Sequence, residues 1–112
     1  MGRSVPGHDR EGVIVRVFLD DLRTPPIGDR LCRTAGEAIA LLKSGVVTFI
    51  SFDHDLGVAP DGYSVACYIE RSVADGRISC PDWAVHSANP VGGARIASAM
   101  RSAERFHNER EG

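Results

Sequence analysis

Apolar positions along the chain fall into short β-branched runs separated by amphipathic stretches. Val13–Leu19 is apolar apart from Arg16, and Val46–Phe52 repeats this pattern, which is typical of buried strands. Two shorter segments, Arg30–Arg33 and Trp83–Val85, also read as strands. The pattern therefore predicts four strands spread along the whole chain.

Helical periodicity fills the intervals between these strands. Thr34 and Glu37 have the spacing of a capping box, and Gly45 supplies a helix stop. Asp61-Gly62 opens a second helix, which Gly76 closes. Its apolar stripe consists of Val65, Ile69 and Val73. Each of these two helices thus joins one predicted strand to the next.

The last helix starts at Asn89-Pro90, with asparagine as the N-cap and proline at the first helical position. Its buried stripe consists of Ile96, Met100 and Ala103. We expect residues 1–12 to be a disordered leader and residues 108–112 to be a frayed tail. One domain, residues 13–107, then holds all the regular structure, and its alternating elements predict an α/β fold with a mainly parallel sheet.

Composition narrows the class of protein. The chain has 112 residues, 43% hydrophobic and 25% charged, with a formal net charge of −2, which is ordinary for one globular domain and does not favour non-specific nucleic-acid binding. No apolar stretch approaches the roughly 20 residues of a membrane span. The first twelve residues lack the apolar region of a secretory signal peptide, which favours a cytoplasmic protein. The three cysteines do not have the spacing of a metal site, so we expect them to be reduced thiols.

Polar residues stand where the three clearest strands end. Asp20-Asp21 follow the strand Val13–Leu19, and Asp53 and Asp55 follow the strand Val46–Phe52. His86 follows the strand Trp83–Val85. The carboxyl ends of parallel strands share one edge of a sheet, where ligands of open α/β folds bind. We therefore expect these groups to meet in one crevice.

The acids Asp20, Asp21 and Asp53 are the candidate metal ligands. Carboxylates gathered this closely raise each other's pKa unless a cation lies between them. Oxygen-only ligands suit Mg²⁺ or another hard divalent cation. The alternative is that these acids only cap strand ends and helix starts.

The candidate catalytic residues are His54, His86 and Asp55. An imidazole with a pKa near neutrality beside a carboxylate is suited to proton transfer. Each histidine could instead ligate a metal or make only a structural hydrogen bond.

A set of residues around the same edge could bind a phosphate. Arg23 offers a planar guanidinium, but it could also simply neutralise the acids. Ser87 could donate to a phosphoryl oxygen or to backbone. Asn89, Gly92 and Gly93 surround a helix N-terminus that attracts anions, and the alternative is an N-cap with small packing residues.

Four segments carry a resemblance to a known family. The segments LDDLRTPP, SFDHDLG, DGYSVACYIE and VHSANPVG resemble the cyclic-phosphate-processing receiver-like domains, a divergent branch of the two-component receiver fold, and the resemblance covers about residues 14–106. The resemblance implies a compact receiver-like (flavodoxin-like) three-layer α/β fold with about four strands in the order 2-1-3-4. By matching positions, the resemblance also assigns functional roles to nine residues: Asp20, Asp21, Arg23, Asp53, His54, Asp55, His86, Ser87 and Asn89.

The sequence departs from an ordinary receiver at three places. The loop LRTPPIGD replaces the first helix, no fifth strand follows Ser87, and Lys43 is the only lysine. A phosphoaccepting receiver uses a lysine on that fifth strand, so conventional phosphorelay is not expected. We expect the C-terminal helix or a second subunit to cover the sheet face left open, and the unprotected fourth strand favours a homodimer.

The function that the resemblance implies is the processing of a cyclic phosphate on a nucleotide or an RNA end. We expect a metal-assisted phosphoric diester hydrolase of the cyclic phosphodiesterase type. The alternative is a non-catalytic or phosphoaccepting regulatory module that uses the same pocket.

Overall fold

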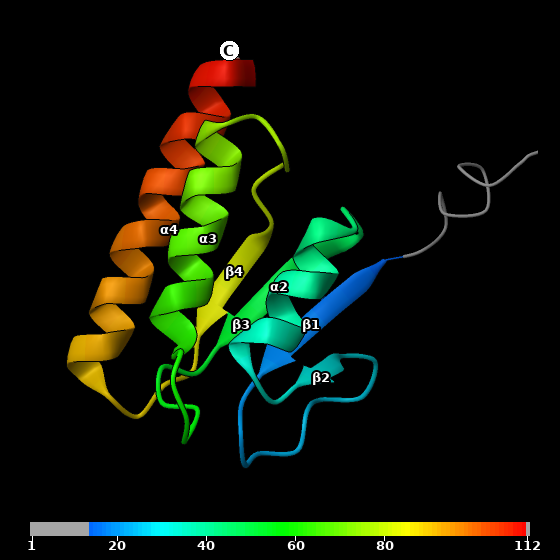
Figure 1. Cartoon of the computed structure of the whole chain (residues 1–112), viewed down its shortest axis with the longest axis vertical. Helices are drawn as coiled ribbons and strands as arrows, with labels where there is room; N and C mark the ends of the chain where they lie inside the picture. Colours follow the sequence, from blue (N-terminus) through cyan, green and yellow to red (C-terminus); the bar gives the residue numbers. More distant parts are fainter. Residues whose placement is uncertain (1–13, 112) are drawn as a thin grey trace, which may run out of the picture.

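The computed structural model describes residues 14–111, so the expected leader, the first residue of the first predicted strand and Gly112 lie outside the described residues. The elements are, in order, β1 (Val15–Leu19), β2 (Arg30–Cys32), α2 (Ala35–Lys43), β3 (Val47–Phe52), α3 (Gly62–Ala74), β4 (Asp82–Val85) and α4 (Pro90–Glu111). Figure 1 shows the elements in chain order. The predicted sequence of strands and helices is confirmed, with bounds that shift by one or two residues.

The four strands form one sheet in the order β2-β1-β3-β4, and every neighbouring pair is parallel. The register aligns Leu19 with Cys32 on one side and with Phe52 on the other. Phe52 in turn lies beside Val85. The carboxyl ends of the strands therefore stand level, as the expected receiver-like α/β fold requires.

One face of the sheet carries the hydrophobic core. Val17 and Ile50, adjacent in the register, are fully buried, and the same core takes in Val65 of α3, Ile96 of α4 and Ala38 of α2. In Figure 1, α3 and α4 lie side by side along their length. All three helices thus pack on the same face of the sheet.

We expected the C-terminal helix or a second subunit to cover the other face of the sheet; the C-terminal helix does not, and a second subunit stays a prediction. The stripe of α4 that was expected to be buried packs against α3, and no helix within residues 14–111 supplies the third layer. The opposite face holds side chains that alternate with the core, among them Arg16, whose guanidinium lies 4.1 Å from the centre of the Phe49 ring. Arg16 also pairs with Asp29, at the end of the β1–β2 loop, at 3.1 Å. Polar and aromatic contacts therefore occupy the face that the missing first helix would cover.

The start of α2 follows the predicted capping box with one change of partner. The Glu37 backbone N–H donates to Thr34 Oγ1 at 3.2 Å, as expected. The Glu37 carboxylate, however, accepts from the backbone N–H of Arg33 at 2.6 Å, one residue before the cap. Gly45, at φ +80°, ends the helix in the left-handed conformation that favours glycine.

The expected frayed tail is helical up to Glu111. Arg110 explains this difference, because its Nη2 donates to the backbone oxygens of Val73 at 3.3 Å and Ala74 at 2.8 Å. The last turn of α4 thereby satisfies the free carbonyl groups at the end of α3. Although α4 has 22 residues, no described helix combines the length and apolarity needed to cross a membrane.

Candidate functional site

The three predicted metal ligands come together at the carboxyl edge of the sheet. Asp20, Asp21 and Asp53 each offer a carboxylate oxygen, and these oxygens lie within 4.8 Å of one another. The backbone N–H of Asp53 donates to the Leu19 carbonyl at 2.9 Å, so sheet pairing itself fixes the ends of β1 and β3 beside each other. The convergence expected from the parallel sheet is present.

Asp20 is held from three directions. It is 1% exposed, its Oδ1 accepts the backbone N–H groups of Leu22 and Arg23, both at 2.8 Å, and its Oδ2 contacts His86 Nε2 at 2.9 Å. Burial raises the pKa of this carboxyl group, but these hydrogen bonds outweigh burial and the net pKa is below its ordinary value. Asp20 is therefore a fixed, ionised carboxylate.

Both ring nitrogens of His86 have partners, and one of these partners is Asp20. Its Nδ1 lies 2.6 Å from Ser51 Oγ, and its ring stacks on Phe18 with centroids 4.5 Å apart. In the neutral imidazole, the Ser51 hydroxyl donates to Nδ1 and the Nε2–H donates to Asp20. Sequence reasoning missed Ser51, although a single hydroxyl between Ile50 and Phe52 in a buried strand is a signal that could have found it.

His54 is enclosed by carboxylates on the other side of the edge. Its Nδ1 lies 2.7 Å from Asp55 Oδ1 and its Nε2 lies 3.3 Å from Asp61 Oδ2. A Cβ on Gly92 would overlap the His54 ring, so this glycine leaves the room in which the imidazole packs. Asp61, expected only as a helix cap, accepts from the Ser64 N–H at 3.1 Å and contacts His54 as well.

The acids line a cleft of about 380 Å³ at this edge. Its lining residues are Asp20, Asp21, Leu22, Arg23, Asp53, Asp55, Gly57 and Ala88. Neither His54 nor His86 is among them, and both nitrogens of each ring already have a partner. The structure therefore places the two expected acid–base histidines behind the cleft, as supports for Asp55 and Asp20.

Arg23 is the only cationic side chain that lines this cleft within the described part of the chain. It is half-exposed; its Nη1 donates to the His86 backbone oxygen at 2.9 Å, and its Nε lies 3.9 Å from Asp20 Oδ2. These contacts leave further guanidinium N–H groups without a described partner. Arg23 can therefore neutralise the neighbouring acids and still bind an anion with its remaining N–H groups.

The other predicted phosphate-binding residues build the turn into α4. Ser87 Oγ accepts the Asn89 N–H at 3.1 Å, Asn89 Oδ1 accepts the Gly92 N–H at 2.9 Å, and the Asn89 carbonyl accepts the Gly93 N–H at 2.8 Å. The backbone donors expected to attract an anion are therefore used inside the turn. Of the two readings given above, this geometry matches the N-cap with small packing residues.

Asp55 is the exposed acid of the cleft. Its pKa is lowered, first by the hydrogen bond from His54 and also by Asn89, whose Nδ2 lies 3.4 Å from Asp55 Oδ2. Asp55 is therefore ionised at neutral pH and is oriented by two neighbours.

Two glycines let the loop after β3 close around the acids. Gly57 has φ +78°, and a Cβ there would lie 2.9 Å from Asp21 Oδ2. A Cβ on Gly62 would overlap the backbone oxygen of Asp53. Any larger residue at either position would displace an acid of the cluster.

Residues 15–102 match the family described as the cyclic-phosphate processing receiver domain. The chain belongs to this family. The match spans β1 to most of α4, and it confirms the resemblance expected from the four motifs. Searches among curated proteins and among solved structures gave no match.

The donor set of this receiver domain fits a hard divalent cation. Three carboxylates have oxygens close enough to share one ion, and no sulfur or free imidazole competes within the described cleft. Mg²⁺ is bound by such oxygen ligands and usually retains water. Because one arginine faces four acids in the cleft, an added cation would relieve their repulsion.

Proposed function

We propose that the acidic cleft hydrolyses a cyclic phosphate on a nucleotide or an RNA end, with Mg²⁺ or another hard divalent cation held by Asp20, Asp21 and Asp53. One observation carries the proposal: three carboxylates from two strand ends converge within 4.8 Å beside an arginine. Membership in the cyclic-phosphate processing receiver family supports the choice of substrate.

The metal ligands differ in how firmly the protein holds them. Asp20 is fully buried and fixed, whereas Asp21 and Asp53 are half-buried and face the cleft. When bound, the cation would supply positive charge that stabilises negative charge on the phosphoryl oxygens. Asp20 would thus set the position of the ion, and the other two acids would close its protein side.

Arg23 would bind the phosphoryl group from the loop after β1. Its anchored Nη1 and its contact with Asp20 hold the guanidinium at the cleft, so little side-chain entropy remains to be lost on binding. A planar guanidinium donates two parallel hydrogen bonds to a phosphate. Arg23 therefore orients the ring phosphate against the acids.

Asp55 would accept the proton of the attacking water. The water oxygen forms a bond to phosphorus, the bond from phosphorus to one ribose oxygen breaks, and the proton reaches that leaving oxygen through solvent. The product is a phosphomonoester with a free neighbouring hydroxyl. His54 acts as a positioning residue in this scheme, because it holds Asp55 at 2.7 Å without lining the cleft.

The phosphoaccepting alternative lacks its usual parts in the described chain. Lys43, the only lysine, ends α2, and no strand follows β4 within residues 14–111. A phosphoaccepting receiver stabilises its acyl phosphate with a lysine on the fifth strand and uses that strand to relay the switch. Neither this lysine nor this strand is present within residues 14–111.

The test is a panel of nucleoside 2′,3′-cyclic and 3′,5′-cyclic phosphates and cyclic-ended oligonucleotides, with Mg²⁺ and with EDTA. We expect turnover that EDTA abolishes and that Asp53→Asn lowers at least 100-fold, since a carboxylate ligand is removed. The control is Asp75→Asn, an exposed acid at the end of α3. Turnover in EDTA, or unchanged turnover in Asp53→Asn, contradicts the proposal; a stable phosphoryl adduct on Asp53 without turnover would favour the regulatory alternative.

A further inference from the structure

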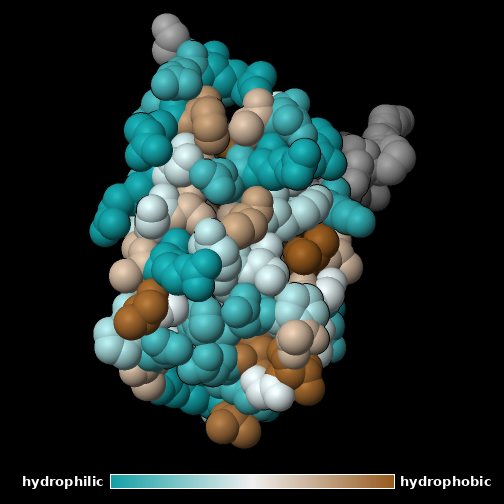
Figure 2. Space-filling view, turned by 60° about the vertical axis from the view of Figure 1, so that its left-hand side comes forward, coloured by the Kyte–Doolittle hydropathy of each residue, from teal (hydrophilic) through white to brown (hydrophobic). Residues whose placement is uncertain are grey.

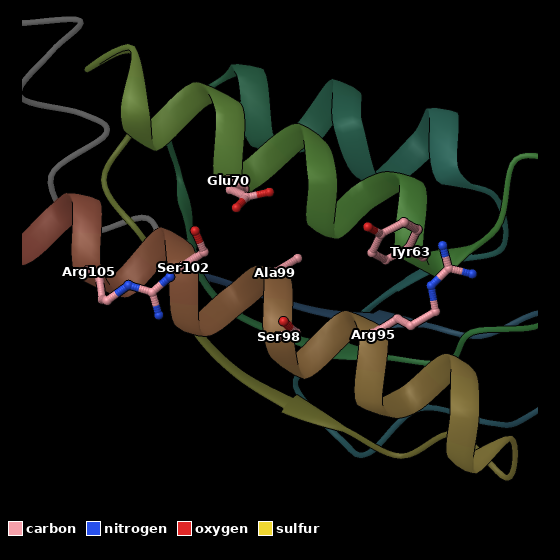
Figure 3. Close-up of a pocket in the computed structure, with 7 residues that line it drawn as sticks. All are labelled: Tyr63, Glu70, Arg95, Ser98, Ala99, Ser102 and Arg105. Atoms are coloured by element: carbon pink, nitrogen blue, oxygen red, sulfur yellow. The ribbon is translucent and has the colours of Figure 1, made fainter.

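A second concave site lies between α3 and α4, away from the acidic cleft. This groove has a volume of about 320 Å³ and shares no lining residue with the cleft. Figure 3 shows Tyr63 and Glu70 on the α3 side, with Arg95, Ser98, Ser102 and Arg105 on the α4 side. Nothing in the proposed hydrolysis uses these residues.

The two arginines give the groove a cation at each end. Arg95 lies with its guanidinium 4.5 Å above the Tyr63 ring, and neither Arg95 nor Arg105 forms an ion pair with another residue between 14 and 111. Their ten-residue separation corresponds to about 15 Å along a helix. Glu70 is the one acid among the lining residues, so the groove has an excess of positive charge in a protein whose net charge is negative.

Hydroxyl groups occupy the space between these cations. Ser98 and Ser102 lie one helical turn apart and both line the groove, and Figure 3 shows the Ser102 hydroxyl directed toward α3. Figure 2 shows the side of the molecule on which α4 comes forward, where hydrophilic surface predominates and apolar groups are scattered. Arginine guanidinium groups, serine hydroxyls and an aromatic ring together are the contacts made to single-stranded nucleic acid.

The groove starts close to the acidic cleft. Tyr63 follows Gly62, whose backbone N–H donates to the His54 carbonyl at 2.9 Å, and Arg95 is three residues beyond Gly92, which packs on His54. The Tyr63–Arg95 end therefore adjoins the edge that holds the acids, and Arg105 marks the far end along α4.

We propose that this groove binds the phosphate backbone of an oligonucleotide whose cyclic end lies in the acidic cleft. That the bound end carries a cyclic phosphate rests on the proposed function. What the groove contributes is the inference that the substrate is a polynucleotide rather than a mononucleotide. Arg95 and Arg105 contact phosphates, the serine hydroxyls donate between them, and the Tyr63 ring holds the Arg95 guanidinium in place by a cation–π contact. Glu70 weakens the interaction by repelling the backbone.

Fluorescence anisotropy with a short labelled single-stranded RNA tests this proposal. In Arg95→Gln/Arg105→Gln we expect about tenfold weaker binding and a salt dependence of log K shallower by about 1.4, the value for two phosphate contacts to a single strand. Glu70→Gln should tighten binding. The matched control is Arg101→Gln, which removes an exposed arginine of α4 that does not line the groove.

The proposal is overturned if Arg101→Gln weakens RNA binding as much as a groove variant does, or if the double variant binds RNA as the parent does. Circular dichroism and Arg95→Lys/Arg105→Lys, which keeps the charge and should restore most of the salt dependence, exclude simple loss of folding. Hydrolysis of the cyclic end of the same RNA, measured in parallel at saturating RNA, reports on the cleft. Groove-dependent RNA binding without such hydrolysis contradicts the proposed reaction but not the groove, and the reverse result contradicts only the groove.

Discussion

At the scale of single residues, Asp20 shows how the protein keeps a charge buried and ionised. Two backbone N–H groups donate to one carboxylate oxygen, and His86, itself held by Ser51 and stacked on Phe18, contacts the other, which keeps a lone pair for a cation. A buried charge with this many hydrogen bonds avoids the large desolvation penalty of an unpaired one. The orientation of Asp20 therefore depends on a side chain that arrives from the end of β4.

Removal of His86 tests this dependence. We expect His86→Ala to weaken Mn²⁺ or Mg²⁺ binding by about 10–100-fold, the usual cost of losing a group that orients a metal ligand, and Ser51→Ala to have a smaller effect of the same sign. Titration calorimetry with Mn²⁺ measures the affinity, and His107→Ala in the C-terminal half of α4 is the control. Unchanged affinity in His86→Ala would mean that Asp20 needs no such support.

At the scale of elements, the start of α4 is packed against the loop that follows β3. Gly92 gives room to His54, and Asn89 caps the helix while its amide also reaches Asp55. The helix thus helps to position an acid of the cleft without lining it. At the other end of α4, Arg110 donates hydrogen bonds to the last carbonyl groups of α3 and so caps that helix.

Substitution of Gly92 by alanine tests this packing. Alanine is the better helix former, yet the added Cβ would overlap the His54 ring, so we expect Gly92→Ala to lower the free energy of unfolding by about 1–3 kcal/mol. Gly36→Ala in α2 is the matched control, because the nearest atom to a Cβ there is Thr34 Oγ1 at 3.9 Å, and it should be neutral or stabilising. Urea unfolding compares the two; equal effects would show that His54 moves aside freely.

At the scale of the whole molecule, the sequence predicted the order of the elements, the parallel sheet and the meeting of the acids. These properties follow from apolar periodicity and from the rule that parallel strands end at one edge. The orientation of His54 and His86 was not predictable in the same way, because Asp61 and Ser51, which hold them, come from other elements. The position of α4 also escaped prediction, since an apolar stripe such as Ile96 and Met100 does not say which face of a sheet it covers.

At this scale the central proposal is that a single divalent cation binds where Asp20, Asp21 and Asp53 converge. The most direct measurement is paramagnetic broadening of backbone amide signals by substoichiometric Mn²⁺. We predict strong broadening confined to residues that follow β1 and β3, such as Leu22 and His54, its reversal by excess Mg²⁺, and its loss in Asp53→Asn. Broadening spread over the exposed acids of α3 and α4, or unchanged in Asp53→Asn, would contradict the account.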